Sequence, residues 1–217
     1  SSDLFIPAAV EVDTAEIETG ATAGNTVFVG DGEKVVGDLV EVGAGGGGVP
    51  NCAGDPTVDP TVIDDTCAIF AQADAGGSME NGTQSAPYRA LQSAIDKATS
   101  TGKRVFVCNS GEFFESIVVS KSVEVHGGFD CSISGQWSWK KGTKAKLKGA
   151  PNFIPLTVIA SAATFGLDDM IVEAASSAPS VMGGSSIAMV VDGVAATLNR
   201  CELVAGDASS GPNGEDA

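Results

Sequence analysis

The stretch of sequence that decides the fold is residues 87–108, which read PYRALQSAIDKATSTGKRVFVC. Its first part has small and apolar residues at helical spacing, namely Ala90, Leu91, Ala94, Ile95 and Ala98. Pro87 lies near the start and Gly102 just past the end, as is typical of a helix, and Ser85 is the expected N-cap. The sequence therefore predicts one helix over about residues 87–100.

From Arg104 onward the pattern changes to short runs rich in Val, Ile and Leu, mostly separated by Gly, Asp, Asn or Ser. Nine strands are predicted, at residues 104–108, 116–119, 123–126, 144–148, 156–159, 170–173, 187–191, 196–200 and 202–204. Because a single helix cannot supply the crossovers of a βαβ sheet, the two candidate folds are an antiparallel sandwich and a parallel β-helix.

Two features favour the parallel β-helix. Strand residues recur about every 22 residues, from Val125 to Leu147 and from Leu147 to Met170, and one coil of a solenoid uses about 20–30 residues. The predicted helix also precedes the strands, where a solenoid needs a cap over its first open edge. The expected fold class is therefore all-β, a parallel β-helix with an N-terminal capping helix.

The N-terminal region, residues 1–50, is expected to be an acidic, β-rich arm. Asp31-Gly32 between apolar runs predicts a hairpin, and four glycines at residues 45–48 predict a hinge. The last coil has no evident cap, and an open coil edge invites pairing with another strand. We therefore expect the arm to fold back onto the coils or to add a strand to a neighbouring copy.

Charge is distributed unevenly along the 217-residue chain, which carries 28 acidic and 12 basic residues for a net charge of −16. Nucleic acid is not an expected partner, because binding it requires a basic face. Residues 1–88 carry −14, residues 89–150 carry +5 and residues 151–217 carry −7. Solvated faces are the simplest interpretation, and pairing of the basic middle with the acidic ends is the alternative.

Five cysteines are present, and none forms the Cys-x-x-Cys pair of a zinc or redox site. Their spacing suits disulfides, which indicates an oxidising compartment. Cys52 and Cys67 bracket the acidic loop of residues 51–86, and residues 87–217 form the third region, the coils, which are expected to continue beyond the C-terminal end. Two uncharged stretches, at 149–167 and 174–191, are too rich in Gly, Pro and Ser to span a membrane.

Residues 81–95, NGTQSAPYRALQSAI, resemble the opening of pectin-lyase-like right-handed parallel β-helix proteins, in which a Gly-Thr-x-x-x-Pro segment leads into a capping helix. Residues 123–128, VEVHGG, match the cadence of the first coils. Residues 127–131 (GGFDC) and 184–188 (GSSIA) are similar to bacterial secreted proteins and surface lipoproteins of mostly unassigned function. The resemblance covers about residues 51–210, and it implies a right-handed β-helix outside the cytoplasm.

Stacked coils of such a fold bring two further cysteines together. Cys108 and Cys131 end or follow strands 23 residues apart, close to one coil, and adjacent strands lie within disulfide distance. The predicted pairs are Cys52–Cys67 and Cys108–Cys131, with Cys201 free and buried. The alternative pairs Cys201 with Cys108 or Cys131.

The resemblance also raises the question of polysaccharide hydrolase or lyase activity. Such hydrolases use clustered aspartates, and Asp168-Asp169 is the candidate pair. The Gly-His and Arg-x-Lys sequences of the hydrolase pattern do not follow it, and neighbours on a strand point to opposite faces, so a polar turn is favoured. His126, the one histidine, is expected to be a structural hydrogen-bonding residue at a strand end.

The sequence contains candidate residues for two ligand sites, and each set also has a simpler interpretation. The acidic loop contains Asp55, Asp59, Asp64 and Asp65, the candidates for a calcium site, although solvated acids are favoured and no cofactor is expected. Trp137 and Trp139 share one face beside Lys140 and Lys141, a combination suited to an acidic polysaccharide. The alternative is a packed tryptophan beside solvated lysines.

Because a complete catalytic set is missing, the sequence predicts a non-catalytic extracellular or bacterial cell-surface protein with a structural or adhesive role. A self-assembling or docked subunit is expected, with a second copy or another surface protein as partner and polysaccharide as a further candidate. The alternative function is a polysaccharide lyase or glycoside hydrolase that acts on acidic polysaccharide.

Overall fold

The structure is a computed structural model that describes residues 10–17, 52–77, 79–159, 161 and 164–211. The hairpin predicted around Asp31-Gly32 and the glycine hinge predicted at residues 45–48 lie outside the described residues. The helices are α1 (Leu91–Thr101) and a 3-10 helix, η1 (Pro60–Val62).

The strands follow one another in short segments, as the apolar runs predict. They are β1 (Val10–Ile17), β2 (Ala68–Ala71), β3 (Arg104–Cys108), β4 (Phe113–Phe114), β5 (Ile117–Val119), β6 (Val123–Ile133), β7 (Gln136–Trp139), β8 (Ala145–Lys148), β9 (Leu156–Ile159), β10 (Thr164–Asp168), β11 (Met170–Glu173), β12 (Met189–Asp192) and β13 (Ala195–Val204). The last two predicted strands are one continuous strand, β13, which bends at Arg200 with a φ of 52°.

Most strands pair in parallel, which produces three ladders. The first contains β2, β3, β6, β10 and the first half of β13, the second contains β4, β8, β11 and the second half of β13, and the third contains β5, β9 and β12. Residues in register are Val105, Val125, Leu167 and Leu198 in the first, Phe113, Leu147, Val172 and Leu203 in the second, and Ile117, Leu156 and Met189 in the third. The expected all-β, mainly parallel architecture is therefore present, and the antiparallel sandwich is not.

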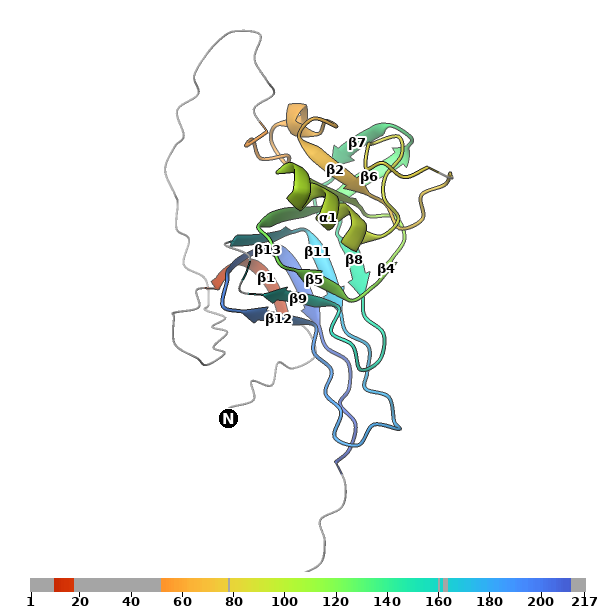
Figure 1. The fold of residues 1–217 in the computed structure, drawn as a ribbon, viewed down its shortest axis with the longest axis vertical. Coiled ribbons are helices and arrows are strands. Elements are labelled where there is room, and N and C mark those ends of the chain that lie inside the picture. Colours follow the sequence, from red (N-terminus) through yellow and green to blue (C-terminus); the bar gives the residue numbers. More distant parts are fainter. Residues whose placement is uncertain (1–9, 18–51, 78, 160, 162–163, 212–217) are drawn as a thin grey trace, which may run out of the picture.

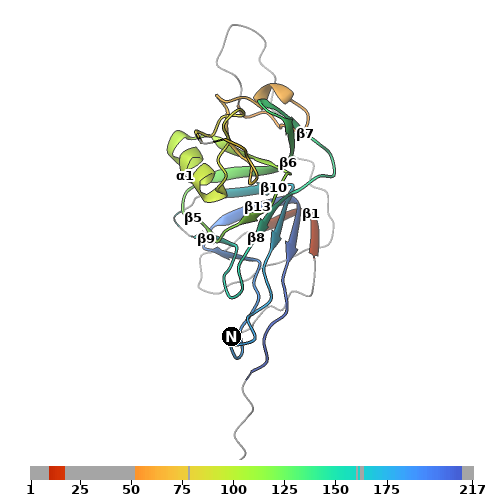
Figure 2. The ribbon, with the colours of Figure 1, turned by 90° about the vertical axis from the view of Figure 1, so that its right-hand side faces the viewer.

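The ladders curl around a common interior (Figures 1 and 2), and buried apolar side chains fill it. Since side chains alternate along a strand, every second residue of the first ladder points inward, and Val125 and Leu198 are only 1% exposed. Helix α1 packs against β2, β3, β5 and β6 and adds its buried residues Leu91 and Ile95 to the same core.

Helix α1 starts four residues later than predicted, and Ser85 is not its cap. Its N-cap is Ala90, which has no capping side chain of its own. Instead, the Glu115 carboxylate accepts hydrogen bonds from the backbone N–H of Leu91 at 2.7 Å and of Gln92 at 3.0 Å. A carboxylate here satisfies free N–H groups and complements the helix dipole, so a distant residue sets the start of the helix.

A second apolar cluster lies on the opposite face of the first ladder. Its members are Val62, Ala68, Phe70, Phe106, Cys108, Phe129, Cys131 and Trp137. Helix η1 and the antiparallel hairpin of β6 and β7 supply the covering residues. Because β2 is thereby covered on both faces, all four of its residues are buried, and the region predicted as a loop over residues 51–86 contains a strand.

Both predicted disulfides are present in the structure. Cys52 pairs with Cys67, with Cα atoms 5.0 Å apart, and Cys108 pairs with Cys131, with Cα atoms 5.8 Å apart. Cys201 is free and buried, as expected. The second disulfide links β3 to β6, which are neighbouring strands of the first ladder.

The strand within the N-terminal arm, β1, pairs with the last strand. It runs antiparallel to β13, from Val10 opposite Leu203 to Ile17 opposite Ala196. This part of the arm, Val10–Ile17, therefore lies back on the ladders, one of the two outcomes expected from the sequence. No helix in the described part of the chain is long and apolar enough to cross a membrane.

Candidate functional site

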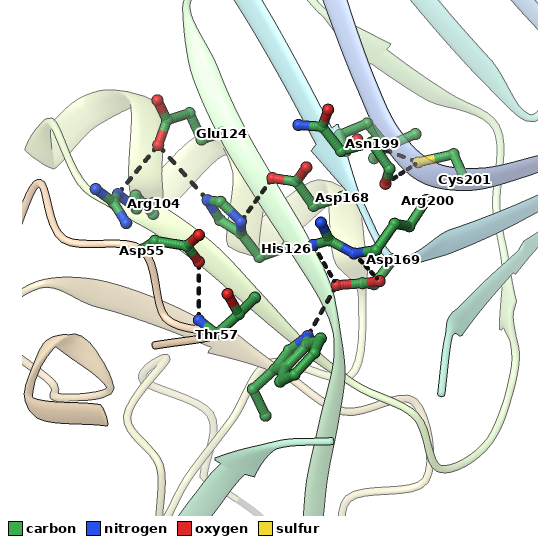
Figure 3. A network of polar contacts seen from close by, with 12 residues as sticks. Asp55, Thr57, Arg104, Glu124, His126, Asp168, Asp169, Asn199, Arg200 and Cys201 are labelled. Carbon is green, nitrogen blue, oxygen red and sulfur yellow. Dashed lines mark hydrogen bonds and ion pairs between the residues drawn. The ribbon is translucent and has the colours of Figure 1, made fainter. Parts of the chain in front are cut away.

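A row of polar side chains runs across the outer face of the first ladder. His126 of β6, Asp168 of β10 and Asn199 of β13 are in register, next to the buried Phe106 of β3. They alternate with the inward-facing residues such as Leu167, so they point away from the interior. Figure 3 shows His126 between Glu124 and Asp168, with Asp169 and Arg200 forming a separate group of contacts close by.

The imidazole ring of His126 lies between two carboxylates. Its Nδ1 is 2.8 Å from Oδ2 of Asp168, a hydrogen-bonding distance, whereas its Nε2 is 3.5 Å from Oε2 of Glu124, which is long for a hydrogen bond. Arg104 approaches Glu124 Oε2 to 3.0 Å with its Nε and donates from Nη1 to the carbonyl of Gly54. His126 is therefore at the centre of a chain of charges that joins β3, β6 and β10.

Burial and charge act in opposite directions on the titration of this pair. Burial by itself would lower the pKa of His126, but the hydrogen bond to Asp168 and the negative charges of Asp168 and Glu124 outweigh it, so the pKa is raised. Burial by itself would raise the pKa of Asp168, but the hydrogen bond and the charge of His126 lead the contributions that lower it. Both directions favour an imidazolium–carboxylate ion pair.

Asp169 forms a second cluster at the turn between β10 and β11. It has a φ of 51° and is only 3% exposed. Its carboxylate accepts hydrogen bonds from Arg200 Nε at 2.8 Å, from Arg200 Nη2 at 2.9 Å and from Trp139 Nε1 at 2.8 Å. The Arg200 guanidinium also lies 5.9 Å from the centroid of the Trp139 ring, within the range of a cation–π contact. Asp169 thus connects the ladder, the hairpin and the last strand.

These two clusters have the residue types of an acid–base site but not its arrangement. A glycoside hydrolase needs one carboxyl group to protonate the leaving group and a second to act on the sugar or on water. Asp168 instead binds His126, and Asp169 binds Arg200 and Trp139. Each carboxylate is held by cationic or N–H partners from other strands, so the arrangement suits cohesion between strands.

The four residues considered for polysaccharide binding do not form one exposed surface. Trp137 is 7% exposed, donates from Nε1 to the carbonyl of Gln84, and packs edge-on against Phe70. Trp139 binds Asp169 through its indole N–H. Lys140 and Lys141 are exposed, so charge is available to a ligand here, but the Trp137 ring is committed to the second apolar cluster.

The lysines of β8 and its N-terminal flank pair with acidic residues of other strands. Lys146 Nζ lies 2.8 Å from Glu173 and 3.2 Å from Glu112, and Lys148 Nζ lies 2.9 Å from Glu173. Lys144 Nζ is 3.7 Å from Glu202. Part of the basic middle of the sequence therefore pairs with its acidic C-terminal part within the molecule.

The acidic loop uses its carboxylates locally. The four candidate calcium ligands accept hydrogen bonds from backbone N–H groups, Asp55 from Thr57, Asp59 from Thr61, Asp64 from Thr66 and Asp65 from Gln84. Such contacts stabilise turns. Among the described residues, no group of three or more His, Cys, Asp or Glu side chains is placed to hold a metal ion.

Asp168, Asp169 and His126 are recognisable in the sequence as candidate polar residues, but the contacts that they make are not. Arg200 and Trp139 come from strands far from Asp169 in the sequence, and only the register of the ladders brings them together. The one local signal in the sequence is the Asp168-Asp169 pair between two apolar runs, since Asp tolerates the left-handed conformation that Asp169 adopts in this turn.

No protein-family model, curated protein or solved structure matches the chain. The resemblance of residues 81–95 and 123–128 to pectin-lyase-like proteins therefore stays a prediction. Any assignment of function rests on the sequence and on the contacts described above.

Proposed function

We propose that residues 87–217 belong to a right-handed parallel β-helix of the pectin-lyase-like kind. The three parallel ladders support this fold, because each passage through the first, second and third ladder corresponds to one coil. Crossovers between parallel strands are right-handed in nearly all proteins, which supports the handedness. The sequence resemblance at residues 81–95 supports the family.

The proposed function is that of a non-catalytic structural or adhesive protein on the bacterial cell surface or outside the cell. The observation that supports it most directly is that Asp168 and Asp169 both bind side chains of other strands, Asp168 that of His126 and Asp169 those of Trp139 and Arg200. The two disulfides support a location outside the reducing cytoplasm. Lys140 and Lys141 are exposed, and binding of acidic polymers to these two lysines can be measured directly.

The competing function is a lyase or hydrolase acting on acidic polysaccharide. It is tested by incubating the protein with such polymers and following unsaturated products and new reducing ends. We expect no turnover from the native chain or from Asp168→Asn. Turnover by the native chain that disappears in Asp168→Asn, with the variant still folded, would overturn the proposal.

The proposed location is tested separately. Intact cells that make the protein are treated with a protease that cannot enter them, and the chain is followed by immunoblot. We expect degradation in intact cells, and full protection until the cells are broken would contradict a surface location.

A further inference from the structure

Strand β13 has partners on both sides. On one side it pairs in parallel with β10 and β11, and on the other it pairs antiparallel with β1 through seven residue pairs. Without β1, that side of β13 would expose a row of backbone N–H and C=O groups, which invites pairing with any available strand. Strand β1 therefore satisfies the backbone groups on this side of β13, as Gly82 and Tyr88 do on the outer side of β2.

Strand β1 pairs with β13 within the described residues, and in sequence it is separated from Cys52 by residues 18–51. A chain of that length can span up to about 110 Å when extended. The covalent connection therefore permits β1 to reach the β13 edge of an adjacent molecule as well as its own.

We propose that β1 pairs with β13 of a second copy of this chain, in the register seen here, so that copies join by strand exchange. Each copy carries both the donor strand and the acceptor edge, and the exchange reproduces every residue pair without a new contact. This inference rests on the proposed structural role. Pairing within a chain competes with pairing between chains, so the exchanged form grows with local concentration, as on a crowded surface.

The register supplies a direct test with the full-length chain. Glu16 of β1 lies opposite Thr197 of β13, and Thr197 is on the outer face, away from the buried Leu198. Glu16→Cys and Thr197→Cys are prepared as separate chains, mixed, oxidised mildly and mapped by mass spectrometry. Cys201, the native free thiol, is fully buried and unchanged in every chain.

We expect a disulfide between the two introduced thiols in the mixed sample, with a yield that rises between about 10 µM and about 1 mM chain. The matched control mixes Glu16→Cys with Ser138→Cys, an exposed position on β7 that is paired with Asp130 rather than with β1. This control is expected to stay at background. A mixed sample that also stays at background would overturn the exchange.

The chain with both substitutions then separates the two reasons for failure. If it closes an internal disulfide while the mixture does not, β1 stays on its own chain. If neither sample forms the disulfide, β1 does not pair with β13. Polysaccharide turnover is measured independently, so failure of the proposed function is distinguishable from failure of strand exchange.

Discussion

The Nδ1 atom of His126 lies 2.8 Å from Oδ2 of Asp168, and this contact joins two neighbouring parallel strands on their outer face. Both side chains are 13% exposed, so solvent screens the pair less than it would a surface ion pair. Breaking such a pair leaves one charge buried without compensation, which is the costly outcome. We infer that the pair contributes to the cohesion of the ladder, with a dependence on pH.

The stability of the fold is predicted to fall above neutral pH. Because the pKa of His126 is raised in the folded chain, its contribution is complete below about pH 6.5 and is lost as pH rises through the raised value. The lowered pKa of Asp168 acts at the acidic side, where stability is lost as pH falls through that value. Urea unfolding at about pH 6 and about pH 8.5 measures the first effect.

The control for this pH dependence is His126→Gln, because the chain has one histidine. Cys201 does not titrate in the same window, since burial raises its pKa to about 12. We expect the variant to lose about 1.5–3 kcal/mol at pH 6 and to show a smaller fall toward pH 8.5. An equal fall in both chains would show that His126 is not the group responsible.

Helix α1 is predicted to depend on Glu115 and not on Ser85. Glu115→Ala removes the acceptor for two backbone N–H groups at the helix start and is expected to lower the free energy of unfolding by about 1–2 kcal/mol. Ser85→Ala is the matched control and is expected to change it by less than about 0.5 kcal/mol. Thermal unfolding of the two variants decides between the long-range cap and the local one.

Gly127 is predicted to be irreplaceable for a steric reason. A Cβ there would overlap the backbone carbonyl oxygen of Asp169 and lie 2.9 Å from Met170 Sδ. Gly127→Ala is expected to cost about 2–3 kcal/mol, because backbone cannot move aside as a flexible side chain can. At Gly76 a Cβ would meet nothing within 4 Å, so Gly76→Ala is the control and is expected to be neutral or slightly stabilising. Equal unfolding midpoints would contradict the close approach.

Much of the fold could be predicted from the sequence because the strands are continuous apolar runs. The predicted bounds of β3, β9 and β11 are the observed ones. The predictions missed β2, which lies in an acidic, Pro-rich region, and β10, which Gly166 interrupts. Neither has a distinctive local pattern, because each strand is stabilised by pairing with distant strands.

The candidate site was less predictable for the same physical reason. Asp168 and His126 could be selected as titratable residues near strand ends, but their contact depends on the register between β6 and β10. The Trp139–Asp169 hydrogen bond depends on a hairpin that continues β6 through Gly127 and Gly128, where the sequence predicted a strand end. A spacing of about one coil was informative for Cys108 and Cys131 because a disulfide requires close Cα atoms.

The central claim is that the outer-face carboxylates hold strands together, and Asp169→Asn tests it most directly. Asn also tolerates a positive φ, so the substitution removes the charge and one good acceptor without backbone strain. Asp192→Asn at the exposed end of β12 is the matched control. Urea unfolding is expected to show a loss of about 2–3 kcal/mol for Asp169→Asn, moderated because the Arg200 side chain is 41% exposed, and a change below about 0.5 kcal/mol for Asp192→Asn. An Asp169→Asn chain as stable as the native one would contradict the claim.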